Sequence, residues 1–156
     1  MSTLLVDELY PGVVFSQNIK ITRNIMVAHI RPWIYKHGVL QDGDLKLEVY
    51  EGATLLKSST INYADINDSF TKDFGHGYIR FDFDSLKLNI PETLSEKEYT
   101  LKFSMINHTL DESNFIGMIR QYERKIYPTY GDIISGEGVN DIIEPLGLEI
   151  YEYVGV

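Results

Sequence analysis

The chain has 156 residues, of which 44% are hydrophobic and 24% charged, the size and composition of one soluble globular domain. Its formal net charge of -9, with no cluster of Lys and Arg, disfavours nucleic acid and anionic membranes as partners. The absence of Cys excludes disulfides, thiol nucleophiles and thiolate metal sites.

The first half of the chain alternates apolar and polar residues, which is typical of β-strands. Residues 1–12 show neither the basic region nor the long apolar region of a signal peptide, so we expect synthesis in the cytoplasm without export. The first two expected strands are 13–22 and 25–35, and Pro32 in the second marks an edge or a bulge. Residues 45–57 predict a hairpin that turns at Glu51 and Gly52.

After a less regular segment at 62–74, where a helical turn fits, the alternation returns in residues 76–83, HGYIRFDF. It predicts that Ile79, Phe81 and Phe83 face the core. The opposite face then holds Tyr78, Arg80 and Asp82, with Arg80 placed to stack on the tyrosine and to pair with the carboxylate.

Further strands are expected in the second half of the chain. The clearest alternation is YTLKFSM, residues 99–105. Residues 115–122 form another expected strand, in which Gly117 indicates a bulge or a close backbone approach. Residues 128–147 are rich in Gly and Pro and predict a long loop, and 146–154 predict a last strand.

Eight to nine strands at this spacing predict an all-β fold, an antiparallel β-sandwich. No repeat, linker or shift in composition divides the chain, so residues 1–156 are expected to form a single domain.

Catalytic motifs are absent from the sequence. There is no GxSxG motif, and with 23 acidic residues in the chain, pairs of carboxylates arise by chance. The histidines lack the spacing of a zinc site. Turn residues such as Asp42, Asp44 and Asp65 offer oxygen ligands for calcium, but turn chemistry explains them without a metal. We therefore expect no enzyme, no catalytic or metal-binding residues and no cofactor, with calcium as the open alternative.

The aromatic residues give the strongest signal, with eleven Tyr, seven Phe and one Trp. Three interpretations are open: cross-strand pairs on the outer face of a sheet, a protein–protein interface, and stacking on sugar rings. The residues concerned are Trp33, Tyr35, Tyr50, Tyr78, Tyr122, Tyr127 and Tyr130.

Three segments together resemble small jelly-roll modules in the virions of tailed bacteriophages, whose fold is similar to galactose-binding-like modules. They are GYIRFDF, the alternating YTLKF and FIGMIRQYE, and the resemblance covers about residues 25–125. Such modules occur in capsid decoration proteins, in fibres and in receptor-binding parts. The resemblance implies a jelly-roll-like sandwich in the virion, made in the host cytoplasm.

On this basis we expect a non-enzymatic structural protein of a phage virion. Its expected partners are the major capsid protein or neighbouring subunits, in a homo-oligomer or symmetric assembly. Residues 1–12 and the 128–147 loop are candidate contacts between subunits, with Tyr78, Arg80, Tyr127 and Tyr130 as anchors.

The first alternative is a carbohydrate-binding, receptor-recognising module that uses Trp33, Tyr35 and Tyr122. A glycan-cleaving enzyme is the third possibility.

Overall fold

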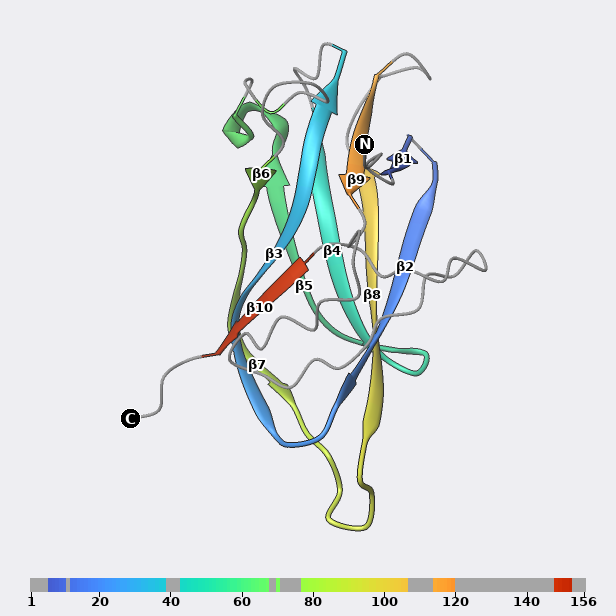
Figure 1. Ribbon diagram of the computed structural model, residues 1–156, viewed down its shortest axis with the longest axis vertical. Coiled ribbons are helices and arrows are strands. Elements are labelled where there is room, and N and C mark those ends of the chain that lie inside the picture. Colours follow the sequence, from blue (N-terminus) through green and yellow to red (C-terminus); the bar gives the residue numbers. More distant parts are fainter. Residues whose placement is uncertain are drawn as a thin grey trace, which may run out of the picture.

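Ten strands make up most of the part of the chain that the computed structural model describes (Figure 1). The described residues are 6–10, 12–38, 43–67, 70, 77–106, 114–119 and 148–152. The strands are β1 (Val6–Leu9), β2 (Val14–Ile21), β3 (Ile25–His37), β4 (Asp44–Glu51), β5 (Thr54–Asn62), β6 (Gly77–Tyr78), β7 (Phe81–Leu88), β8 (Lys97–Ile106), β9 (Phe115–Ile119) and β10 (Leu148–Glu152). No helix in these residues is long and apolar enough to cross a membrane.

The strands form two antiparallel sheets, which confirms the predicted all-β sandwich. The four-stranded sheet has the order β2-β8-β4-β5. The six-stranded sheet has the order β1-β9-β3-β10, and β6 and β7 also pair with β3. Because Ile30 of β3 is opposite both Phe81 and Ile150, β3 has partners on both sides and is an interior strand. The two short strands β1 and β6 account for ten strands rather than eight or nine.

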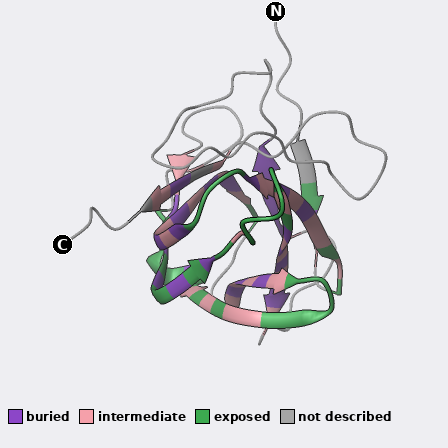
Figure 2. Cartoon of the chain, turned by 90° about the horizontal axis from the view of Figure 1, so that it is seen from below, coloured by how far each residue is buried: buried purple, intermediate pink, exposed green. Residues whose placement is uncertain are grey.

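The core lies between the sheets and follows the expected alternation. Four residues of β8 are buried, and the polar residues between them are only partly buried. Phe81 and Phe103 from opposite sheets meet edge to face, with 6.1 Å between ring centroids. Figure 2 looks along the strands and shows buried residues alternating with more exposed ones. The described strands share this core, and the assignment of the whole chain to one domain stays a prediction.

Pro32 does not mark the edge of a sheet, because it lies within interior strand β3. The N–H of Ile79 donates to the Pro32 carbonyl at 3.2 Å, and proline has no N–H to return a second bond. Beside it, Ile79 and Arg80 lie outside the strands, so HGYIRFDF contains parts of two strands rather than one. Ile79, Phe81 and Phe83 are nevertheless buried as predicted. The proline interrupts the row of backbone hydrogen bonds on one side of β3 without ending the sheet.

Bulges change which residues face the core in β3 and in β7. In β3, Val27 and Ile30 are both buried, because the pairing shifts by one residue at Ala28. The pairing of β3 with β7 shifts between Val27–Leu86 and His29–Asp82, and Ser85 in this part of β7 has a φ of 60°. The bulge in β3 turns His29 and the alternate residues after it away from the core.

The predicted hairpin and helical turn are both present. β4 and β5 pair along their length, and Gly52 in the turn has a φ of 58°, which glycine adopts without strain. The chain then forms a 3-10 turn, η1 (Tyr63–Asp65), in which the Ala64 N–H donates to the Asn62 side chain. The 128–147 loop and residues 1–5 lie outside the described residues, so their role as contacts is not tested.

Candidate functional site

The outer face of the six-stranded sheet holds a row of stacked side chains, which we call the aromatic ladder. It consists of His29, Arg31 and Trp33 of β3, Tyr78 of β6 and Tyr151 of β10. The three β3 residues of the ladder face outward because successive side chains of a strand point to opposite faces. Ile30 and Ile34, which alternate with them, are buried in the core. All five ladder side chains are half-buried, so each keeps a part that a partner can reach.

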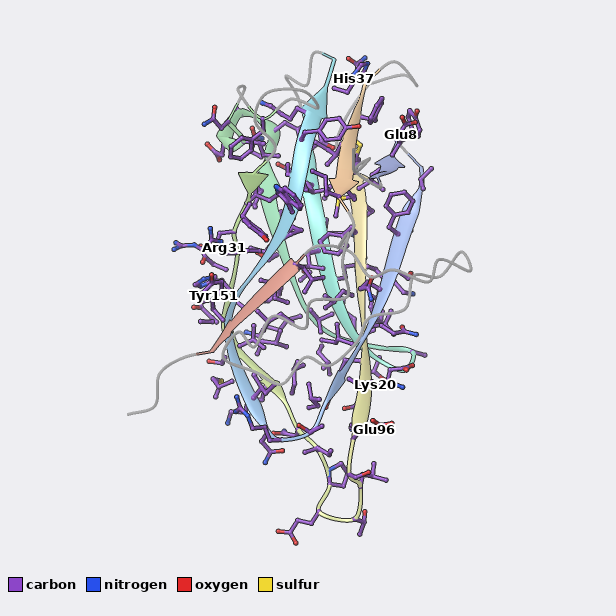
Figure 3. The ribbon with its side chains drawn as sticks, in the orientation of Figure 1. Glu8, Lys20, Arg31, His37, Glu96 and Tyr151 are labelled. Atoms are coloured by element: carbon purple, nitrogen blue, oxygen red, sulfur yellow. The ribbon has the colours of Figure 1, made fainter. Side chains whose placement is uncertain are left out.

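Contacts run through the ladder without interruption. The His29 and Tyr151 rings stack with 4.5 Å between centroids, and those of Trp33 and Tyr78 with 6.1 Å. The guanidinium of Arg31 lies between the two tyrosines, 5.3 Å from the Tyr78 ring centroid and 5.4 Å from that of Tyr151. Arg31 Nη1 also donates to Tyr151 Oη at 3.1 Å, and Figure 3 shows these two residues side by side. The contacts hold the ladder in one arrangement.

Further along the same face of β3, the next side chain is buried. Tyr35 is only 2% exposed and forms a second apolar cluster with Phe115 and Ile119. Its ring lies on Gly117, where a Cβ would meet Tyr35 Cε1 at 2.1 Å, so the predicted close approach at this glycine is present. This burial removes Tyr35 from the residues that could stack on a sugar. Its neighbour Trp33 remains half-buried and accessible.

A polar groove of about 530 Å³ lies beside the ladder, between the edges of the two sheets. Residues 59–62 of β5 line one side, and residues 78–80 and Asp82 line the other. Asp65, Asn67 and Phe70 complete the lining. Tyr78 therefore belongs both to the ladder and to the groove.

The predicted pairing of Arg80 with Asp82 is present at the groove. Arg80 Nε lies 2.9 Å from Asp82 Oδ1 and Nη2 donates to Oδ2 at 3.4 Å, with the side chains 61% and 66% exposed. An ion pair this exposed contributes little to stability. The cation over the Tyr78 ring is Arg31, from β3, where the sequence suggested Arg80.

Most residues of the ladder were not predicted from the sequence. His29, Arg31 and Tyr151 were not singled out, although alternate polar and aromatic residues in β3 were a usable signal. Three singled-out tyrosines, Tyr122, Tyr127 and Tyr130, lie outside the described residues.

The clearest pKa shifts lie away from the ladder and have structural causes. Burial, and then the charge of Asp44, raise the pKa of Tyr63 far above its ordinary value. A hydrogen bond from Lys97 lowers the pKa of Glu51, and the same bond raises the pKa of Lys97. No group of three or more His, Asp or Glu side chains in the described ranges is placed to hold a metal ion. These shifts indicate packing and ion pairing and point to no reaction.

Comparison of the chain with protein-family models, with curated proteins and with solved structures found no match.

Proposed function

We propose that this chain is a non-enzymatic structural protein of a phage virion, which binds neighbouring virion proteins through the aromatic ladder. The observation that supports it best is the position of Arg31 between Tyr78 and Tyr151 on a half-buried sheet face. Tyr, Trp and Arg are the residues that most often dominate the binding energy of protein interfaces.

The ladder is suited to a protein partner because its side chains are already ordered. Stacking and the hydrogen bond to Tyr151 restrict the rotamers of Arg31 before any partner arrives. Ordering a long side chain at an interface costs roughly 0.5–1.5 kcal/mol, and here that cost falls on folding rather than on binding.

The assignment to a virion rests on the resemblance of GYIRFDF, YTLKF and FIGMIRQYE to phage modules, and the charge agrees with it. A chain with a net charge of -9 is repelled by the DNA that a capsid contains. The proposed partners are the major capsid protein or neighbouring copies in a symmetric assembly.

Mass spectrometry across a density gradient of purified particles tests the proposal. A constant high copy number relative to the major capsid protein is expected for a decoration protein, and a low one for a tail or receptor-binding part. Absence from the particle band would overturn the assignment to a virion.

Matched alanine variants test the role of the ladder. The outer face of the other sheet provides the control, because Lys102 Nζ lies 4.4 Å from the Tyr50 ring centroid. We expect Arg31→Ala to lose incorporation into particles and Lys102→Ala to keep it. Equal incorporation of both variants would remove the ladder from the interface.

Carbohydrate binding is a second candidate, favoured by the half-buried Trp33 beside Tyr78. An indole whose ring is partly accessible offers a surface for stacking on a sugar. Quenching of Trp33 fluorescence by millimolar sugars would favour this function, and a flat titration across a glycan panel would exclude it.

A further inference from the structure

The polar groove lies where two sheet edges face each other. Within the described residues, β5 pairs with β4 alone, and β6 and β7 pair with β3 alone. Along an edge strand, alternate residues direct N–H and C=O groups away from the one neighbour that they have. Residues of β5 and of the β6–β7 segment line the groove together, so these outward-directed groups border it.

A hydrogen bond between the two sheet edges closes one end of the groove. The side chain of Lys57 in β5 donates to the carbonyl of Asp84, next to the bulge residue Ser85 in β7. The groove begins two residues further along β5, at Ser59. The two sheet edges are therefore joined at Lys57 and separated by the groove along residues 59–62.

Among the residues that the structure describes, the open part of β5 has none of the usual protection of an edge strand. Natural edges are blocked by charged side chains, proline or bulges. Residues 59–62 read STIN, without charge or proline, and the register with β4 is regular there. The nearby cation, Lys57, is committed to the Asp84 carbonyl.

We propose that this groove binds an extended peptide segment of another protein, which adds as a strand to the edge of β5. Four residues of β5 span about 13 Å at ~3.3 Å per residue, which matches about four residues of an added strand. The backbone of the peptide would bond to β5, and its alternate side chains would reach the opposite wall at Arg80 and Asp82.

The charges of the groove favour a basic peptide. Asp65 and Asp82 are exposed carboxylates in its lining, and Arg80, which pairs with Asp82, is the one cation among the lining residues that the structure describes. The described lining therefore carries one more negative charge than positive. The chain as a whole carries a charge of -9, which also argues against a second copy of the chain as the occupant. The occupant is therefore an extended segment with Lys or Arg at alternate positions.

Fluorescence anisotropy with three labelled peptides of equal length tests this inference on the full chain. One peptide alternates Val and Lys, the second alternates Val and Glu, and the third is the Val–Lys peptide with proline in place of alternate valines. We expect the Val–Lys peptide to bind about tenfold more tightly than the other two, because the second has the wrong charge and each proline in the third removes one backbone N–H donor. Equal binding of the Val–Lys and proline peptides, or no binding at millimolar concentration, would overturn strand addition.

Variants of the chain place the binding in the groove. Asp65→Asn is expected to weaken the Val–Lys peptide about two- to fivefold. Glu92→Gln is the control, since Glu92 is an exposed acid in the turn after β7 and does not line the groove. Equal losses in both variants would mean that only the overall charge attracts the peptide, which would overturn the inference. Competition by neutral sugars would assign the groove to a glycan instead.

This inference concerns a second surface and can fail separately from the proposed function. Tyr151→Ala alters the ladder on β10, which pairs with the side of β3 opposite β7, and Tyr151 does not line the groove, so this variant should leave peptide binding unchanged. Loss of virion incorporation with intact peptide binding is the result expected if both assignments are correct. Intact incorporation would overturn the role of the ladder, and weakened peptide binding would show that the groove is not a separate surface.

Discussion

Replacing Tyr63 by Phe is expected to stabilise the protein. Tyr63 is 0% exposed, and its hydroxyl has no hydrogen-bond partner among the residues that the structure describes. A buried polar group without a partner loses its bonds to water on folding and gains none in return. Burial and the nearby charge of Asp44 raise the pKa of this hydroxyl, so it is neutral at pH 7 and its titration does not disturb the comparison.

The magnitude follows from the same contacts. An unsatisfied buried hydroxyl costs about 1–3 kcal/mol, and removing the oxygen forfeits a smaller amount of packing. A net gain of about 1 kcal/mol in the free energy of unfolding would raise the Tm of a chain this long by about 2–4 °C.

Tyr99 provides a control with the same chemical change and the opposite sign. It is 1% exposed, and its hydroxyl accepts from the Asn89 N–H at 3.0 Å and donates to the Asn89 carbonyl at 2.5 Å. Tyr99→Phe breaks both bonds and should cost about 1–3 kcal/mol. Urea titration of the wild type and of both variants, with calorimetric Tm values, measures the two changes. If Tyr63→Phe lowers stability as Tyr99→Phe does, then the Tyr63 hydroxyl has a partner, and the reasoning from its burial is refuted.

Three further predictions concern other contacts. Gly117→Ala should cost about 1–3 kcal/mol in urea titration, because its Cβ would overlap the Tyr35 ring, and an unchanged midpoint would mean that the ring moves aside easily. Lys36→Met removes donors to the carbonyls of Tyr63 and Ile66 at 3.3 and 2.7 Å and should cost about 1.5–3 kcal/mol by the same measurement, whereas no loss would show that η1 stands without this support. Because the hydrogen bond from Lys97 lowers the pKa of Glu51 below its ordinary 4.5, the stabilisation it gives is present above that pH and is lost as the pH falls through the lowered pKa. Thermal melts of wild type and Glu51→Gln should differ at pH 7 and converge in acid, and a difference that persists in acid would assign the effect to something other than this charge.

The sequence predicted what depends on local alternation. Strands, the hairpin at Gly52 and the buried set Ile79, Phe81 and Phe83 follow from period-two patterns and turn residues, and all are present. The bulge at Ala28 could not be predicted, because neither Gly nor Pro marks it and only the pairing with neighbouring strands shows it.

The parts of the site that join distant residues were also hidden. Arg31 and Tyr151 are 120 positions apart, and nothing local to either residue indicates the other. Trp33 and Tyr35 share one face of β3, and only the pairing of Tyr35 with Gly117 decides that one is accessible and the other is buried. The groove arises because edges from different sheets come together, which no single stretch of sequence records.

The pairing of β3 with β10 has a consequence for how the chain folds during synthesis. Interior strand β3 leaves the ribosome about 120 residues before Tyr151, which at about 5–20 residues per second is a delay of roughly 6–24 s. For that time residues 27–32 of β3 lack the partner that β10 supplies, beside other nascent chains on the same messenger RNA. Slower translation or a higher growth temperature should therefore increase aggregation of new chains, even where the finished protein is stable. Chaperones that bind exposed aromatic strands would act on this protein mainly before β10 is made.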